Sequence, residues 1–207
     1  MKSDPEAKPA LRISHIVYKR VTEGNRVQYL IDPQGVVQTT AIPEQVVLKR
    51  WRRRIFAGHV FKGARLSATV WRAWHATFGM ANVREMSPER IKRFIETATP
   101  SLKQRHLKLP DAETVRALAQ HCGPVAMRLL IERHTTKPKG ESGVPDLFLY
   151  AVRSDTDQVS IARFVEVKKP QEKLSDSQRL EIAFLQYQGL HARVLRLKER
   201  EMHQGQS

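Results

Sequence analysis

The sequence predicts an α/β protein in which helices come first and a small sheet follows. Several segments between residues 41 and 134 carry apolar residues at helical spacing. After Gly143 the pattern changes, and strand-like runs occupy DLFLYAV (146–152), ARFVEVK (162–168) and HARVLRL (191–197). A helical pattern separates the last two runs. The strand-helix-strand order predicts that these two strands lie parallel in one sheet.

Composition narrows the class of protein. The chain has 207 residues, which suggests one or two domains. With 41% hydrophobic and 28% charged residues, a mainly disordered chain is excluded. The sequence contains no run of about 18 apolar residues, so we expect no membrane-spanning helix. The start, MKSDPEAKPALRIS, lacks the apolar core of a secretory signal. Together with the single Cys122, this predicts a cytoplasmic protein, nucleoid-associated in a bacterium or nuclear in a eukaryote.

The elements before Gly143 follow from local signals. We expect a flexible tail over 1–10 and a hairpin over Arg26–Gln38, with DPQG as its turn. A helix is predicted over 41–56, with Pro43 and Glu44 in its first turn and Gly58 and Gly63 breaking the pattern after it. Further helices are predicted over 67–77, from the cap Ser87-Pro88-Glu89 to about Thr97, over 111–121 and, after Cys122-Gly123-Pro124, to His134.

The elements after Gly143 have equally clear boundaries. The polar turn RSDTDQ joins the first two strands. Ser175 and Gln178 form the S-x-x-Q pattern of a capping box, which opens a helix that Gly189 ends. A charged segment that we expect to fray, residues 199–207, follows the last strand.

Positive charge is the most prominent feature of the composition. The formal net charge is +15, which favours a polyanionic partner: nucleic acid first, an anionic membrane or the ribosome next. No Asp or Glu occurs from Gln45 to Arg84, a window with nine Lys or Arg residues. The candidate phosphate contacts in it are Lys49, Arg50, Arg52, Arg53, Arg54, Lys62 and Arg65. The alternative is a solvated basic surface without a partner.

The basic window also contains all three tryptophans, Trp51, Trp71 and Trp74. Aromatic side chains among basic ones suit packing against bases or sugars. Core positions on amphipathic helices are the alternative, and the i, i+3 spacing favours the core for Trp71 and Trp74.

The residues that carry chemistry are Pro145-Asp146 and Glu166-Val167-Lys168. Side chains alternate along a strand, so Glu166 and Lys168 share one side and Val167 points to the other. Carboxylates at neighbouring strand ends offer oxygen ligands for Mg²⁺ or Mn²⁺, and the Val167 carbonyl can add another. Lys168 would position the attacking water in phosphodiester hydrolysis. The alternative is a turn aspartate beside an exposed strand pair.

Three strings, GVPDLFLY, FVEVKKPQEKLSDSQ and LQYQGLHARVLRL, closely resemble the VRR-NUC domain of the PD-(D/E)XK nucleases. The resemblance implies a restriction-endonuclease-like core, a mixed sheet flanked by helices, over residues 135–198. The segments IPEQVVLKRW…GHVFKGARL and Ser87 through HCGP are similar to the part that precedes this core in the Fanconi-associated nuclease family. Residues 11–134 would then be a hairpin plus a helical DNA-binding extension. The family's long N-terminal part and the acidic residue expected near Gly63 are missing.

The resemblance also implies residue roles. Asp146 and Glu166 correspond to metal ligands and Lys168 to the catalytic lysine. Gln178 resembles the helix glutamine of the family, with the capping box as its alternative role. We assign the remaining acidic residue to Glu44, although Glu44 would also suit a helix N-terminus. Two other residues compete for this acidic role, Glu132 and Glu141. Two histidines, His59 and His75, are either phosphate contacts or ordinary surface or core residues.

The expected function is therefore that of a metal-dependent, structure-specific nuclease. It would cut flapped or branched DNA in replication or repair and would have no membrane partner. A non-catalytic DNA-binding fragment of a larger nuclease and an antibacterial nuclease toxin are the alternatives.

Overall fold

The computed structural model describes residues 12–23, 26–30, 39–40, 42–137 and 143–199. Its elements in chain order are β1 (Ile13–Glu23), β2 (Arg26–Leu30), β3 (Thr39–Thr40), α1 (Pro43–Arg52), β4 (His59–Arg65), α2 (Ala68–Phe78), the 3₁₀ turn η1 (Val83–Glu85), α3 (Pro88–Gln104), α4 (Ala112–Thr136), β5 (Leu147–Arg153), β6 (Val159–Lys168), α5 (Asp176–Tyr187) and β7 (Ala192–Glu199). None of these helices is long and apolar enough to cross a membrane.

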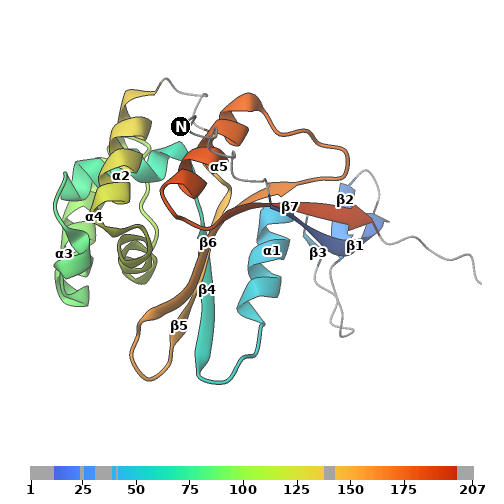
Figure 1. Ribbon diagram of the computed structural model, residues 1–207, viewed down its shortest axis with the longest axis horizontal. Helices are drawn as coiled ribbons and strands as arrows, with labels where there is room; N and C mark the ends of the chain where they lie inside the picture. Colours follow the sequence, from blue (N-terminus) through green and yellow to red (C-terminus); the bar gives the residue numbers. More distant parts are fainter. Residues whose placement is uncertain (1–11, 24–25, 31–38, 41, 138–142, 200–207) are drawn as a thin grey trace, which may run out of the picture.

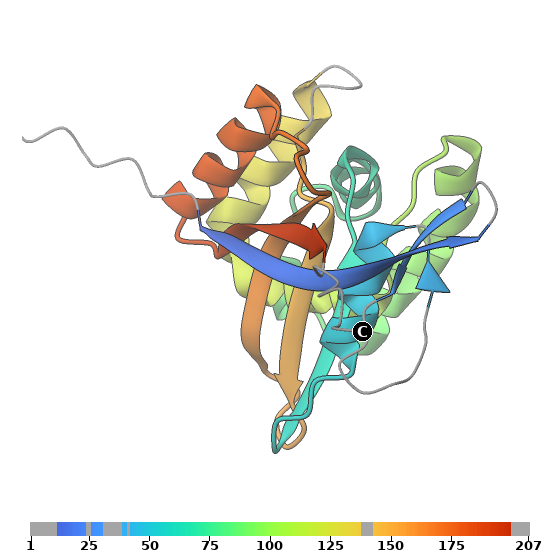
Figure 2. The ribbon, with the colours of Figure 1, turned by 90° about the vertical axis from the view of Figure 1, so that its right-hand side faces the viewer.

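One mixed sheet runs through the molecule in the strand order β3-β2-β1-β7-β6-β5-β4. Strands β4, β5 and β6 pair antiparallel, whereas β7 lies parallel to both β6 and β1. The parallel pairing of β6 and β7 across α5 confirms the predicted crossover. In Figure 2 the long strand β1 runs beside β7, and β2 and β3 extend the sheet away from the helices.

Helices cover the central strands on both faces (Figure 1). Helix α1 packs on one face through Val47, Leu48 and Trp51, which meet the odd-numbered residues of β5 and β6. Helices α2, α4 and α5 pack on the other face in a larger core that also includes Phe148 and Phe164. This larger core contains residues from both sides of position 134, so the helices before it and the strands after it pack together.

The predicted helix boundaries are mostly confirmed. The Ser87 side chain accepts a hydrogen bond from the Arg90 amide at the start of α3, which runs on beyond Thr97 to Gln104. The two helices predicted around Gly123 are present as halves of α4, and Gly123 sits between them at φ 66°. Trp71 and Trp74 are 1% and 0% exposed, which confirms the core alternative for both.

Three strands, β1, β3 and β4, escaped the sequence analysis. The turn DPQG and the expected partner strand 36–38 lie outside the described residues, as do residues 1–10; the hairpin that the structure describes joins β1 to β2. The helix predicted over 41–56 ends at Arg52. Of the two glycines predicted to follow this helix, Gly58 sits in a turn at φ 72°. Gly63 is instead a strand residue, and its missing side chain lets Phe148 O approach closely. Pairing with β5 and packing against α1, both long-range, stabilise β4.

Candidate active site

The candidate site begins where β4, β5 and β6 meet. Asp146 immediately precedes β5, and its Oδ2 atom accepts a hydrogen bond from the Val167 amide at 2.7 Å. The Asp146 carbonyl accepts another from the Leu66 amide at 2.7 Å, just after β4 ends. The first bond fixes the carboxylate against the end of β6, and the second holds the Asp146 backbone beside the end of β4. Arg65, which pairs with Leu147, therefore lies beside the site.

Glu166 and Lys168 share one face of β6, as the strand alternation predicts. Glu166 is 1% exposed, and Lys168 Nζ lies 3.1 Å from its Oε1 atom. Gln178 Nε2 donates a hydrogen bond to the same Oε1 at 2.5 Å. Gln178 Oε1 also accepts from the Ser175 amide, which completes the capping box. The two roles considered for Gln178 therefore coexist, and the start of α5 is fastened to Glu166.

Burial shifts the protonation of both carboxyl groups. Desolvation, together with the nearby charges of Glu44 and Glu172, raises the pKa of Asp146 to about 6 despite the hydrogen bond from Val167. Desolvation and the charge of Asp146 raise the pKa of Glu166 to about 7. Both groups resist ionisation because they share a poorly solvated space, and a cation placed between them would reverse that effect.

Glu172 is a site residue that the sequence analysis missed. Its Oε1 atom lies 3.0 Å from Lys168 Nζ, and its Oε2 atom accepts a hydrogen bond from the Lys169 amide. Burial alone would lower the pKa of Lys168, but the carboxylates of Glu172 and Glu166 outweigh it and hold this pKa above its ordinary value. Lys168 is therefore a permanent cation. The i, i+4 spacing of Lys168 and Glu172 was the only available signal in the sequence.

The donor set suits a hard divalent cation. The Glu166 Oε2 atom is buried without a hydrogen-bond partner. With Asp146 and the Val167 carbonyl it would supply oxygen ligands, which Mg²⁺ and Mn²⁺ prefer. In the described part of the chain, no three His, Cys, Asp or Glu side chains gather closely enough to hold a metal ion by themselves. The Val167 carbonyl and water would have to complete any such coordination.

The candidates for a further acidic residue differ in position. Glu44 is half-buried in the first turn of α1, and its charge acts on Asp146. Glu132 is exposed on α4, and its charge is not among those that act on Asp146, whereas Glu141 lies outside the described residues. His59 begins β4 at the end away from Arg65, where its ring contacts Ala57 O, and His75 is exposed on α2. The structure brings neither histidine to Asp146.

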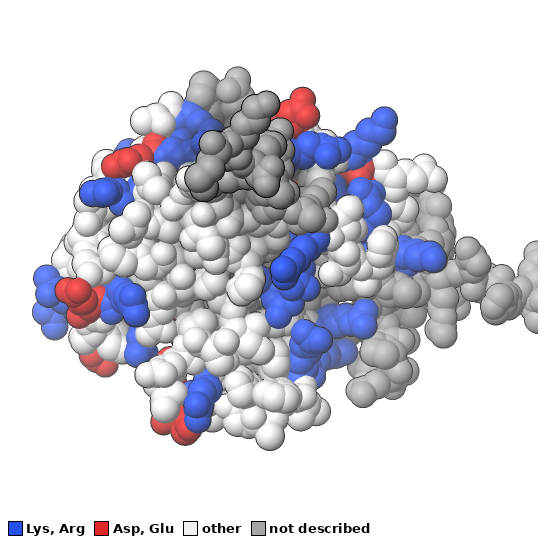
Figure 3. Space-filling model, viewed as in Figure 1, with Lys and Arg blue, Asp and Glu red and all other residues white. Residues whose placement is uncertain are grey.

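The predicted basic residues divide into two groups. Lys49, Arg50 and Arg53 are exposed on or just after α1, and Figure 3 shows basic side chains beside this helix in an area free of acidic ones. The others have partners within the fold or lie elsewhere: Arg52 donates to Gly63 O, Arg54 stacks over the Trp51 ring, Lys62 pairs with Glu113, and Arg65 ends β4.

Trp51 does not offer a stacking surface for a base. It is 5% exposed, and its indole N–H donates to the carbonyls of Lys62 and Tyr150. The indole thus holds α1 to β4 and β5. The prediction of base or sugar packing by Trp51 is wrong, because the apolar core and the guanidinium groups of Arg54 and Arg163 already cover its ring.

Gly143 positions the start of α5 and provides a stability test. It has φ +56°, and a Cβ atom there would lie 2.2 Å from Ser177 O. We expect Gly143→Ala to destabilise the fold by about 2 kcal/mol or more, since it adds a backbone clash to the cost of a positive φ. Gly79→Ala is the matched control, with φ +56° and open space around its Cβ. Chemical denaturation compares them, and equal losses would mean that the Ser177 contact is unimportant.

The fold and the site together define a class of protein. The order β7-β6-β5-β4, with α1 and α5 on opposite faces and Asp146, Glu166 and Lys168 at the strand ends, is the restriction-endonuclease-like core of the PD-(D/E)XK superfamily. A family model of the VRR-NUC domain matches residues 86–199, more than half of the chain. The chain therefore belongs to the VRR-NUC family, as its strings in 143–197 predicted.

Solved structures share this fold. Two crystal structures of paFAN1, bound to DNA with a gap and a 5′ flap of 2 or 1 nucleotides, superpose with a TM-score of 0.50 at 14% and 16% identity. They cover 97% and 96% of this chain, which spans 40% of theirs. At this identity the likeness shows the fold alone. No curated protein sequence matches the chain.

Proposed function

We propose that the protein is a metal-dependent DNA nuclease that cuts flapped or branched DNA in replication or repair. The main support is that Asp146, Glu166 and Lys168 lie together at one end of the sheet, where the Val167 amide holds the Asp146 carboxylate. Membership of the VRR-NUC family and the resemblance to a DNA-bound nuclease fold support the substrate.

The chain's own residues divide the work. Asp146, Glu166 and the Val167 carbonyl would hold Mg²⁺ or Mn²⁺, with Glu44 as the further acidic residue. When bound, the cation supplies Lewis-acid stabilisation of charge at the scissile phosphate. Lys168, kept protonated by Glu172 and Glu166, orients the attacking water and offsets phosphate charge. Gln178 keeps the Glu166 carboxylate in place.

The exposed basic residues of α1 would contact the DNA backbone. We expect Lys49→Ala/Arg50→Ala/Arg53→Ala to weaken duplex binding and to lower the log–log salt slope by about 2.7, since each lost phosphate contact removes roughly 0.9. Binding titrations at several salt concentrations measure the slope. The control variant Lys92→Ala/Arg93→Ala/Lys103→Ala removes the same charge from exposed positions of α3. Equal log–log salt slopes in both variants would indicate that the basic α1 residues form a solvated surface without DNA contacts.

The raised carboxyl pKa values predict opposite pH effects with and without a divalent cation. Without it, native Glu166 and Asp146 bind protons that the unfolded chain has already lost, so stability should fall as pH rises from about 4 to 7. With Mn²⁺, ionised carboxylates become ligands, and the stabilisation by the metal should grow over the same interval. Thermal melts in EDTA and in Mn²⁺ check both trends, and a pH-independent Mn²⁺ effect would contradict the assignment.

One experiment tests the function as a whole. The chain is incubated with end-labelled duplex, 5′-flap, 3′-flap and four-way-junction DNA in Mg²⁺, in Mn²⁺ and in EDTA. We expect cleavage of the flapped or branched substrates in either metal and none in EDTA. Binding without cleavage in any metal would instead favour a non-catalytic DNA-binding protein.

A further inference from the structure

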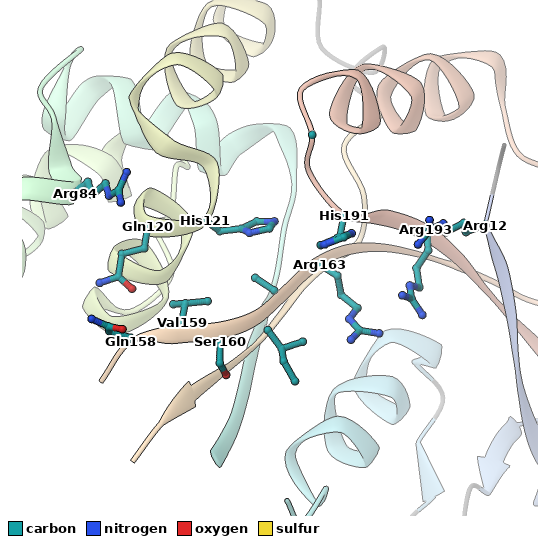
Figure 4. A pocket seen from close by; sticks show the side chains of 13 residues that line it. Arg12, Arg84, Gln120, His121, Gln158, Val159, Ser160, Arg163, His191 and Arg193 are labelled. Atoms are coloured by element: carbon teal, nitrogen blue, oxygen red, sulfur yellow. The ribbon is translucent and has the colours of Figure 1, made fainter. Parts of the chain in front are cut away.

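A second basic site lies beside the first half of β6, whereas the candidate active site lies at the far end of that strand. A cavity of about 810 Å³ opens beside residues 158–163, bounded by η1, the middle of α4 and the start of β7 (Figure 4). A strand rises about 3.3 Å per residue, so along β6 Glu166 is about 20 Å from Ser160 and about 10 Å from Arg163, whose side chain lies on the opposite face of the strand. The cavity shares no lining residue with the candidate active site.

The lining of this cavity is basic and unpaired. It contains Arg12, Arg84, Arg163 and Arg193 but neither Asp nor Glu. Among the described residues, none of these four guanidinium groups has a carboxylate partner. Arginines that a fold draws together without a counter-charge cost stability, which is a common feature of sites built for a bound anion.

Two of these arginines converge. Figure 4 shows the side chains of Arg163 and Arg193 pointing into the same space beside α1. The Arg163 guanidinium lies 5.0 Å from the centre of the Trp51 ring, on which Arg54 also stacks. Burial and the charges of Arg193 and Arg54 lower the pKa of Arg163 to about 10, and burial with Arg12 and Arg54 lowers that of Arg193. A phosphate between them would relieve this repulsion.

The rest of the cavity wall is better suited to an unpaired base than to the surface of a duplex. His191 is exposed, and its ring lies nearly parallel to that of His121, with centroids 6.5 Å apart. The pairing of β7 with β6 begins only at Phe164. Since the Phe164 amide donates to His191 O on that side, the backbone N–H and C=O of Ala162 point the same way, into the cavity. An imidazole platform and free backbone groups are means of holding splayed single-stranded bases.

The geometry points to a second nucleic-acid site, in which Arg12, Arg84, Arg163 and Arg193 hold the phosphate backbone of a single strand of DNA or RNA and His191 packs against a base. The site goes beyond the proposed cleavage function and does not require it. An acidic peptide would also pair with the free edge of β6, but its Asp and Glu side chains offer no ring to pack against His191.

Binding of labelled oligothymidylate and oligouridylate to the full chain in EDTA tests this site. We expect Arg163→Gln/Arg193→Gln to weaken binding about tenfold or more, since it removes two charge-assisted contacts. The log–log salt slope should fall by about 1.4, at roughly 0.7 per phosphate on a single strand. Arg93→Gln/Arg128→Gln removes the same charge from exposed positions on α3 and α4 and should keep the wild-type slope. The relative affinity of the two oligonucleotides shows whether DNA or RNA is preferred.

The Arg163→Gln/Arg193→Gln variant should melt no lower than the wild type, because it removes mutually repelling charges. Should it fail to fold, Arg84→Gln alters only an exposed member of the lining and should weaken binding in the same direction. Equal affinities and salt slopes in the Arg163→Gln/Arg193→Gln variant and the Arg93→Gln/Arg128→Gln control would overturn the site. So would binding of oligoglutamate that depends on Arg163 and Arg193, without binding of oligonucleotide. The binding test is run in EDTA, which prevents metal-dependent cleavage. A wild type that fails to cleave DNA in Mg²⁺ or Mn²⁺ would therefore count against the nuclease function and not against this binding site.

Discussion

Replacing Lys168 with Ala should reduce DNA cleavage by roughly 100-fold to 1,000-fold or more while DNA binding stays nearly intact. Lys168 is the cation beside the Glu166 carboxylate, and removing a preorganised charge from a reacting centre typically has an effect of this size. Most of the affinity would come from phosphate contacts elsewhere, which the variant leaves in place. Single-turnover cleavage and anisotropy titrations on the same flapped DNA give the two quantities.

The chain supplies a matched control in the neighbouring residue. Lys169 is exposed and its hydrogen bonds with Glu172 come from its backbone, so Lys169→Ala should cleave at nearly the wild-type rate. Asp146→Asn keeps an acceptor for the Val167 amide but loses the charge, and it should be as inactive as Lys168→Ala. Cleavage by Lys168→Ala at the wild-type rate would contradict the assignment of this site as the catalytic centre.

Glu44→Gln should lose nearly all cleavage, whereas Glu132→Gln should stay active. Glu44 is half-buried at the start of α1 and near enough to Asp146 to raise its pKa, while Glu132 is exposed on α4. The variant keeps the shape of the side chain but removes a negative charge that a divalent cation would use. If Glu44 served only the helix N-terminus, the loss would be about 0.3–1 kcal/mol of stability.

Two further measurements sharpen this test. In EDTA, Glu44→Gln should lower the pKa of Asp146, because a like charge is removed, and proton titration by NMR can follow this carboxyl. Glu172→Gln is the informative comparison, since Glu172 also acts on Asp146 and contacts Lys168. An active Glu44→Gln beside an inactive Glu172→Gln would transfer the acidic role to Glu172.

Local patterns in the sequence were enough to predict the core after Gly143. Strand alternation placed Glu166 and Lys168 on one face of β6, and the S-x-x-Q pattern placed the start of α5 at Ser175. Both signals work because the deciding hydrogen bonds and side-chain directions involve residues a few positions apart. The cap at Ser87 and the break at Gly123 were predictable for the same reason.

Long-range pairing decided what the sequence left open. Strand β4 reads as a glycine-broken segment until β5 and α1 pack against it. Glu44 and Glu172 come near Asp146 only when α1 and the loop after β6 meet at the end of the sheet. The sequence by itself determined the family, the elements after Gly143 and the Asp146, Glu166 and Lys168 set. The tertiary structure alone gathered Arg12, Arg163 and Arg193, which are far apart in the chain, because burial of apolar residues brings their strands together whatever the charge between them.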